Sequence, residues 1–458
     1  RTIKWVVFDT TKDEREEKRM KRKLVTILIG CMALGLFGCG SGLSDTTKRL
    51  TPQQSEDSEQ NVDHTGNEDQ QAEADTTEKK AEDDSTETTF GYRYRQFALN
   101  LLQQTYEDGK NEMISPLSVL AALTMTENGA KGDTLTQMEQ VLSGGMPAEQ
   151  QGKELSSCMK NLPDTENAHL NIANSIWLKD ADTFHVEDDF LRKNTELFDA
   201  EIFKAPFDDS TLKDINTWVS NKTEKMIPEI LDQIEYDSVM YLINAVAFDA
   251  KWQSPYEKED VQDGTFTPEN GGSQSVDMMY STEGYYLEDD STTGFIRPYE
   301  EGYSFVALLP KEGISMSDYI SQMSAEKLVT VIANAGTDYE VDAAIPKFKS
   351  EYSVELNDTL KNMGMTDAFD PEKADFSGIG TSDRGNLYID MVLHKTYIEV
   401  DEQGTKAGAA TVVGIAEYAS LETPVVKTVH LDRPFVYAII DNETQMPIFL
   451  GVTETITQ

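Results

Sequence analysis

From Phe90 to the end of the chain, apolar residues recur in regular patterns without a further low-complexity break. Phe90, Tyr94, Phe97 and Leu101 fall on one face of a helix. Pro116 stands at the first turn of a second predicted helix, where proline is tolerated. Because a stretch of this length can bury a large core, we expect a single domain over residues 90–458.

Later segments of this stretch are rich in apolar and aromatic residues over lengths typical of strands. They are Leu170–Leu178, Met240–Phe248, Tyr303–Leu309, Tyr388–Val400, Phe435–Ile440 and Ile448–Val452. Helices and strands are mixed without a strict βαβ alternation, and no internal repeat is visible. The sequence therefore predicts an α+β fold with mixed or largely antiparallel sheets.

Residues 39–89 have a different composition. Between Gly40 and Thr89 the chain consists mainly of Ser, Thr, Asp, Glu and Gln, with few large apolar residues. Such a segment buries too little surface to offset its ordering entropy, so we expect an acidic, disordered tether. An acidic binding tail is the alternative interpretation.

The chain before this tether contains a targeting signal. Basic residues at Met20–Lys23 precede an apolar run from Leu24 to Phe37 that is short for a bilayer span. The run ends at Cys39 in a box that resembles the bacterial lipoprotein cleavage site. We expect residues 20–38 to be a lipoprotein signal peptide and lipidated Cys39 to hold the protein on the outer face of the cell membrane. An ordinary signal peptide or a single membrane anchor are the alternatives, and residues 1–19 look like a mis-called start.

Charge and residue counts exclude several classes of partner. The formal net charge of −42 argues against nucleic acid and against an anionic membrane bound by basic patches. The three cysteines, Cys31, Cys39 and Cys158, form no CxxC pair, so no disulfide scaffold or cysteine zinc site is expected. The histidines lack metal-ligand spacing, and we expect neither metal nor cofactor. They are His64, His169, His185, His394 and His430.

The stretch Val400–Gly414, with the sequence VDEQGTKAGAATVVG, has an unusual composition. It is a run of small residues without proline, in a place where a domain rarely leaves so much backbone uncommitted. A loop that later becomes a central strand needs these properties, because proline would remove a ladder donor and a large inward side chain would have to be buried. The inward positions would be Thr405, Ala407, Ala409 and Thr411, and the outward ones Lys406, Gly408 and Ala410. The alternative is a flexible linker.

Over Phe90–Thr453 the chain resembles the serpin family. The matching positions are Asn111, Ser115, Pro116, Ser118, Gly129, Ala130, Gly132, Thr134, Gln137, Met138, Asn171–Leu178, Asn216, Trp218, Val219, Thr223, Leu242, Asn244, Ala245, Phe248, Trp252, Ile345–Phe348, His394, Lys395, Arg433–Phe435 and Phe449–Gly451. The resemblance implies helices packed around mixed and antiparallel sheets, with an exposed reactive-centre loop. It also implies an inhibitory hinge at Glu402, Gly404, Thr405, Ala407, Gly408, Ala409, Ala410 and Thr411.

A serpin of this kind is a single-use inhibitor and not an enzyme. The family's hinge spacing implies a reactive bond between Tyr418 and Ala419, which suits chymotrypsin-like proteases; the bond between Ala419 and Ser420 is the alternative and suits elastase- or subtilisin-like enzymes. Serine proteases are the expected partners and cysteine proteases a second group, and we expect a monomer.

Further positions match the family's switch regions. Ser115, Ser118, Asn244 and His394 match a polar cluster where central strands part, although satisfied core polar groups would look the same. The resemblance implies a salt bridge between Lys347 and Glu402 in the uncleaved protein. Trp252 matches the aromatic residue beneath that pair, or is a plain core tryptophan.

Three rival functions remain. A non-inhibitory serpin that acts as a carrier, chaperone or surface-binding module would keep the fold but would show proline or bulky residues in the hinge. A hydrolase lacks support because the chain has no GxSxG motif and no His-rich site. A cell-surface adhesion protein would account for the anchor and tether but not for the composition of Val400–Gly414.

Overall fold

The computed structural model describes residues 2–8, 43–50, 89–223, 225, 228–235, 238–405 and 425–457. The helices are α1 Phe90–Thr105, α2 Pro116–Glu127, α3 Gly132–Ser143, α4 Ala148–Asn161, α5 Asp188–Phe198, α6 Asp209–Lys222, α7 Met316–Ser321, α8 Ala325–Ala333 and α9 Asn357–Met363. Within these described ranges, no helix is long and apolar enough to cross a membrane.

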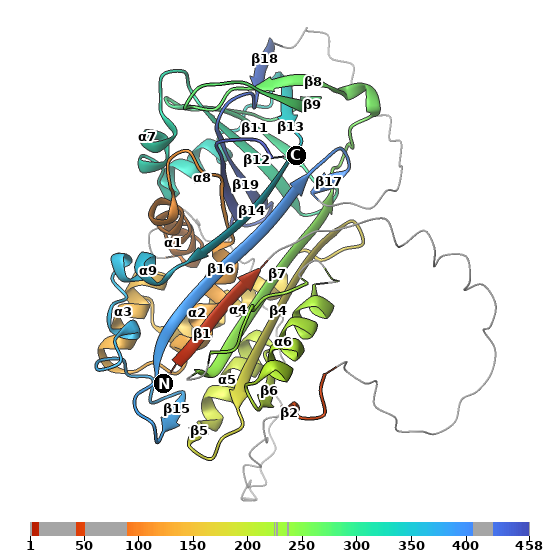
Figure 1. The fold of residues 1–458 in the computed structure, drawn as a ribbon. Coiled ribbons are helices and arrows are strands. Elements are labelled where there is room, and N and C mark those ends of the chain that lie inside the picture. Colours follow the sequence, from red (N-terminus) through yellow and green to blue (C-terminus); the bar gives the residue numbers. More distant parts are fainter. Residues whose placement is uncertain are drawn as a thin grey trace, which may run out of the picture.

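The largest sheet lies in the lower and middle parts of the molecule as drawn in Figure 1. Its strand order is β1-β16-β17-β7-β4-β6-β2, and β14 pairs with β16 outside this path. The strands are β1 Thr2–Phe8, β2 Lys48–Leu50, β4 Ala168–Lys179, β6 Glu201–Ala205, β7 Ser238–Lys251, β14 Phe348–Glu355, β16 Tyr388–Val400 and β17 Gly404–Thr405. Almost every residue of β7 is buried, which explains its nearly continuous apolar sequence.

The remaining strands form smaller sheets, most of them at the other end of the molecule (Figure 1). One has the order β10-β11-β12-β19-β20-β3, another β18-β13-β9-β8, and β15 pairs with β5. Their bounds are β3 Glu112–Ile114, β5 Phe184–Val186, β8 Val261–Phe266, β9 Gln274–Glu283, β10 Tyr286–Glu288, β11 Thr292–Pro298, β12 Tyr303–Pro310, β13 Tyr339–Pro346, β15 Gly380–Ser382, β18 Val425–His430, β19 Phe435–Asp441 and β20 Pro447–Thr453.

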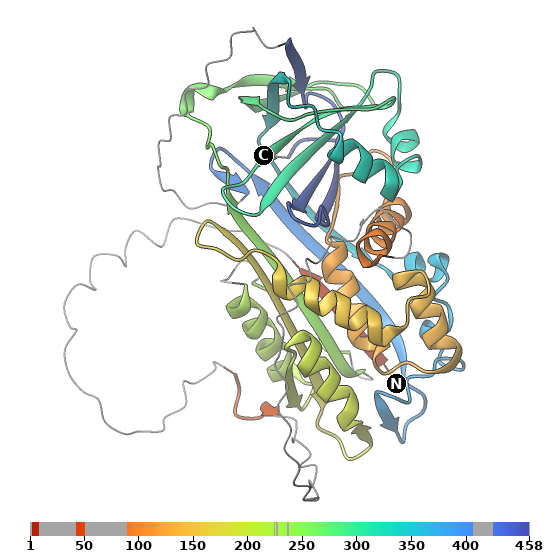
Figure 2. The ribbon, with the colours of Figure 1, turned by 180° about the vertical axis from the view of Figure 1, so that it is seen from behind.

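Helix α2 forms the centre of the core because it contacts both β7 and β20. All of its residues are buried, including the polar Ser118, Thr124, Thr126 and Glu127. Its start is fixed by Pro116 in the first turn and by Ser115, whose side chain accepts a hydrogen bond from the Ser118 backbone N–H. Figure 2 shows α1, α3 and α4, in orange to yellow, on the same face of the large sheet as α2, whereas α6 packs on the opposite face over Trp177 and Tyr241.

The predicted fold class is confirmed. The expected strands correspond to β4, β7, β12, β16, β19 and β20, and the first two expected helices to α1 and α2. Burial of both faces of the central strands made these segments recognisable as apolar runs.

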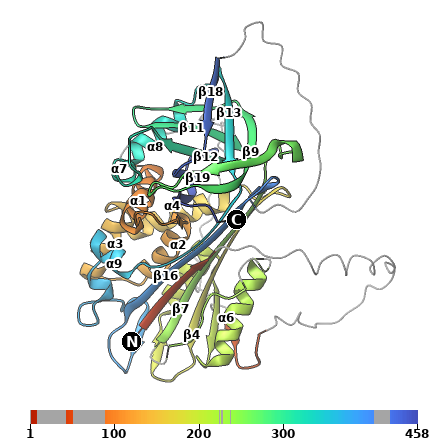
Figure 3. The same ribbon diagram turned by 45° about the horizontal axis from the view of Figure 1, so that its top comes forward.

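The structure differs from the sequence analysis before Phe90. Residues 1–19 were left out of the predicted fold, but Thr2–Phe8 pair in parallel with both β16 and β7 (Figure 3). Part of the predicted disordered tether is also structured, since Lys48–Leu50 pair with β6. Each segment pairs with the backbone of a strand that lies far away in the sequence. Local composition does not reveal such a partner.

Candidate functional site

The candidate site is the space between β7 and β16, which we call the slot. At one end of it, β16 turns at Asp401 and returns as β17, whose Gly404 and Thr405 pair antiparallel with Lys251 and Ala250 of β7. Along the rest of the slot, β1 pairs with β7 from Ser238 to Ala245. The slot therefore contains two strand segments that run in opposite directions.

The turn into β17 is held by short-range contacts. Asp401 Oδ1 accepts hydrogen bonds from the backbone N–H of Gln403 at 2.8 Å and of Gly404 at 3.2 Å. Burial raises the pKa of the Asp401 carboxyl, and these two backbone donors oppose that rise. Gly404 is required by a close approach, because a Cβ there would lie 2.0 Å from the carbonyl oxygen of Ala250.

Beneath this turn lies the hinge cluster, defined as Trp252, Tyr299, Lys347, Glu402 and Thr405. Trp252 Nε1 donates to the Asp401 carbonyl oxygen at 2.9 Å, and its ring stacks on Tyr299 with centroids 4.4 Å apart. The Tyr299 hydroxyl lies 2.6 Å from Thr405 Oγ1. Lys347 Nζ forms an ion pair with Glu402, the salt bridge that the resemblance implied. The start of β17 is thus joined to the core by its side chains.

The central polar cluster comprises Ser115, Ser118, Asn174, Asn244 and His394. The Ser115 backbone N–H donates to His394 Nε2 at 3.1 Å, and Ser118 Oγ donates to Asn244 Oδ1. Asn244 Nδ2 donates to Asn174 Oδ1 at 2.7 Å. These contacts join α2 to β4, β7 and β16 across the floor of the slot.

His394 has one ring nitrogen to spare. It is fully buried, and within the described parts of the chain its Nδ1 has no hydrogen-bond partner. Burial lowers the pKa of His394 to about 3, so the imidazole is neutral at ordinary pH. A neutral ring whose Nε2 accepts from Ser115 carries its proton on Nδ1, which leaves a donor available in the slot.

The structure thus brings together Ser115, Ser118, Asn244 and His394 in one cluster, and Trp252, Lys347, Glu402, Gly404 and Thr405 in the other. Cys39, Ala407–Thr411 and the reactive-bond residues Tyr418, Ala419 and Ser420 lie outside the described residues. Sequence reasoning missed the contacts of Tyr299 and Asn174, since nothing local distinguishes them from ordinary sheet residues.

Comparisons with known proteins agree with this geometry. Residues 92–455 match the family model of serpins, described as serine protease inhibitors. Leukocyte elastase inhibitor A of Mus musculus is 32% identical over 372 residues, which covers 78% of this chain and 96% of the relative. The native-state crystal structure of tengpin, a thermophilic serpin, is 49% identical with a TM-score of 0.75, covering 80% of this chain and 94% of tengpin.

A more distant structure contains a small-molecule ligand. Thyroxine-binding globulin in complex with thyroxine is 26% identical with a TM-score of 0.68, and the match covers 80% of this chain and 99% of that protein. The fold is therefore found in proteins named for inhibition and in one named for binding a small molecule. With the family model matched over most of the chain and two polar clusters lining the slot, this chain belongs to the serpin family.

Proposed function

We propose that this chain inhibits serine endopeptidases by offering residues 406–424 as a substrate loop and then inserting the hinge end of that loop into the slot. The observation that carries the proposal is β17. The hinge residues Gly404 and Thr405 already form an antiparallel strand between β16 and β7. Insertion then extends a strand that has begun, which avoids the cost of starting one.

The register of β17 predicts where each further residue goes. With Thr405 opposite Ala250, continuation places Ala407 opposite Phe248, Ala409 opposite Val246 and Thr411 opposite Asn244. Because Thr405 points inward to Tyr299, the alternate residues Ala407, Ala409 and Thr411 would also point inward. They are small, as a strand laid over a packed core requires.

The same register accounts for the spare donor in the central polar cluster. Val400 pairs with Thr405, so continuation along β16 would bring Thr411 opposite His394 as well as opposite Asn244. The Thr411 hydroxyl could then accept from the His394 ring nitrogen that now has no partner among the described residues. Insertion would satisfy a buried polar group, which adds to its driving force.

The pairing of β1 supports the proposal that the slot can accept an added strand. Residues 2–7 pair with both β16 and β7, so the backbone groups along this part of the slot are able to bind an added strand. If the chain is cleaved before Cys39, as the signal-peptide prediction implies, Thr2–Phe8 are removed and those groups become available to the loop.

The chemistry follows from the order of events. The protease serine Oγ attacks the scissile carbonyl carbon, and the amine of the next residue leaves with a proton from the protease histidine, which gives an acyl-enzyme. Cleavage frees the hinge end, and a full strand of ladder bonds at about 1 kcal/mol each supplies on the order of 10 kcal/mol. Moving the attached protease deforms its oxyanion hole, so deacylation stalls.

We propose the Tyr418–Ala419 bond as the reactive bond, because a large aromatic side chain suits a deep chymotrypsin-like pocket. The bond between Ala419 and Ser420 is the alternative. A non-inhibitory binding role, suggested by the likeness to thyroxine-binding globulin, is the second candidate. It leaves the partial insertion of β17 without a purpose.

We further propose that the mature protein begins at Cys39, carries lipid on this residue and acts on the outer face of the cell membrane. The support is the basic and apolar run before Cys39 and the lipoprotein-like box that contains it.

The test is covalent trapping. The chain from residue 39 onward, with Cys39→Ser, is incubated with chymotrypsin, elastase and subtilisin, and a band at the summed mass that survives denaturation is expected with at least one of them. The mass of the released carboxy-terminal fragment should show that it begins at Ala419; a fragment that begins at Ser420 would move the reactive bond by one residue.

Two matched variants test the insertion step. Ala409→Arg places a charge on the inward face and should convert the inhibitor into a substrate that is cleaved without a stable complex. Ala410→Arg makes the same change on the outward face and should retain trapping. Equal trapping by the two variants, or cleavage of the parent without a complex by all three proteases, would contradict the proposed function.

A further inference from the structure

The segment Leu43–Leu50, which we call the N-terminal latch, is docked on the edge of the large sheet. Ser44 donates from its backbone N–H to Asp214 Oδ1 at 2.8 Å and from Oγ to Oδ2 at 2.5 Å. Thr47 Oγ1 donates to the same Oδ2 at 2.6 Å. Asp214 on α6 is 2% exposed, so a buried carboxylate receives three hydrogen bonds from the latch. A charge buried in this way needs such donors.

The latch also extends the sheet. Lys48–Leu50 pair antiparallel with Ile202–Lys204 of β6, which would otherwise be an open edge. Leu43 packs against an apolar cluster that includes Trp177, Phe203 and Trp218. Arg49 lies 3.4 Å from Glu201 in an ion pair at the surface. Backbone, hydroxyl and apolar contacts therefore all hold the same eight residues.

We propose that the latch fixes the orientation of the inhibitor on the membrane, with the α6–β6 edge toward the lipid surface and the end that bears β17 and β18 away from it. This inference rests on the lipidation of Cys39 proposed above. From Cys39 to Leu43 there are four residue steps, which reach at most about 14 Å. If the chain first contacted the domain at Thr89, a coil of fifty residues would separate the domain from the lipid by about 40 Å. The orientation of the domain would then be free.

The register of the sheet gives the direction. Arg49 lies opposite Phe203, Phe203 opposite Trp177, and Trp177 opposite Tyr241 of β7. The hinge residue Thr405 lies opposite Ala250, nine positions further along the same strand, which is a distance of about 30 Å. Figures 1 and 2 accordingly show β2 and β18 toward opposite ends of the molecule. A protease approaching from the medium then meets the loop end first.

The experiment measures the height of two positions above a bilayer. The chain from Cys39 onward, lipidated in a bacterial host, is placed in phosphatidylcholine vesicles that contain an acceptor dye on the lipid headgroup. With Cys158→Ser removing the native thiol, a donor dye is attached at Lys213→Cys on α6 or at Val425→Cys on β18, both exposed positions. We expect energy transfer to be several-fold higher from position 213.

Variants of the latch provide the decisive comparison. Ser44→Ala with Thr47→Val removes both hydroxyl donors to Asp214, and the two transfer efficiencies should then approach each other. Thr46→Val is the matched control, since among the described residues Thr46 Oγ1 bonds to the Ser44 and Ser210 hydroxyls and not to Asp214. Equal transfer from both positions in the parent, or a difference that survives the double variant unchanged, would overturn the proposal.

Anchoring and latch are separated by two readouts on the same sample. An intact mass without the lipid would refute the anchoring and with it the orientation. Amide exchange over residues 44–50 needs no lipid, and it should be slow in the parent and in Thr46→Val but fast in the double variant. Fast exchange in the parent would refute the latch itself. Neither result depends on trapping of a protease.

Discussion

At the scale of single residues, the site is built from buried polar groups whose ionisation is set by their surroundings. His394 is kept neutral because burial lowers its pKa to about 3. The unfolded chain has an ordinary histidine pKa of about 6.5, so it binds a proton first as the pH falls. The stabilisation from neutral His394 is therefore fully present above pH ~6.5 and is lost between pH ~6.5 and 3.

This predicts a pH dependence that one substitution removes. Between pH 6.5 and 5, His394 should cost the native state about 2 kcal/mol of unfolding free energy, at about 1.4 kcal/mol per pH unit. His394→Gln should flatten this slope, as measured by denaturant unfolding at several pH values. His185→Gln, the same substitution at an exposed histidine, is the matched control. If the unfolding free energies of the parent and of His394→Gln fell in parallel as the pH is lowered, His394 would not be the source of the pH dependence.

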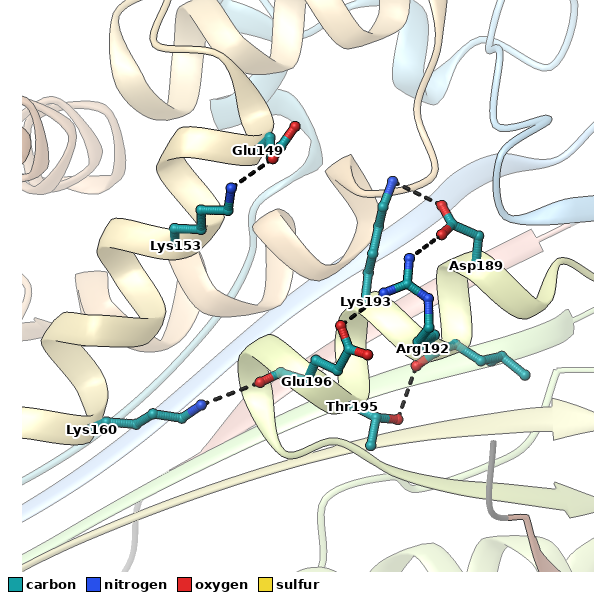
Figure 4. Close-up of polar contacts among 9 residues, drawn as sticks. Glu149, Lys153, Lys160, Asp189, Arg192, Lys193, Thr195 and Glu196 are labelled. Atoms are coloured by element: carbon teal, nitrogen blue, oxygen red, sulfur yellow. Dashed lines mark hydrogen bonds and ion pairs between the residues drawn. The ribbon is translucent and has the colours of Figure 1, made fainter. Parts of the chain in front are cut away.

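At the scale of elements, an aspartate contributes differently to stability when it is exposed on one helix and buried on another. Asp189 on α5 pairs with Arg192 and Lys193 at the exposed surface (Figure 4). Its pKa is lowered, first by the hydrogen bond from Lys193 and then by that from Arg192. Such exposed pairs contribute little, because solvent screens them and two long side chains lose freedom. Asp214 on α6 is instead buried beneath the latch.

The expected result is a clear contrast in stability. Asp214→Ala should lower the unfolding free energy by about 2 kcal/mol, since it removes the acceptor of three hydrogen bonds. Asp189→Ala should change it by less than about 1 kcal/mol. Thermal and denaturant unfolding of the two variants check this, and similar losses at both positions would contradict the role given to the buried carboxylate.

The sequence predicted correctly those elements whose own residue pattern indicates that they are buried. The apolar run of β7 predicted a strand because both of its faces are covered, whereas β16 alternates buried and half-buried residues. Sequence reasoning failed for β1 and β2, where the partner strand lies far along the chain. It also missed the bond between Tyr299 and Thr405, because residues 106 positions apart meet only through the sheet register. The hinge stays a prediction beyond Thr405, because Ala407–Thr411 lie outside the described residues.

At the scale of the whole molecule, insertion of the loop should convert the protein into a more stable form. About 10 kcal/mol of new strand interactions corresponds to a rise in Tm of about 13 °C for a domain of this size, at about 2 cal/mol/K of unfolding entropy per residue. Cleavage of the loop by a protease that is not trapped should produce this rise, measured by calorimetry before and after digestion. Ala409→Arg should be cleaved without the full gain. An unchanged Tm after cleavage of the parent would mean that the loop stays out of the slot.

The position of Trp252 makes it a fluorescent reporter of the loop. Its indole N–H donates to the Asp401 carbonyl oxygen at the turn into β17, whereas Trp177 and Trp218 belong to the apolar cluster that packs against Leu43. From Cys39 onward these are the chain's tryptophans. Their emission depends on the polarity around each ring, so entry of the loop should change the signal that Trp252→Phe abolishes. Release of the latch should change the remaining signal, which comes from Trp177 and Trp218. The unlabelled protein thus carries one fluorescent reporter for the loop and another for the latch.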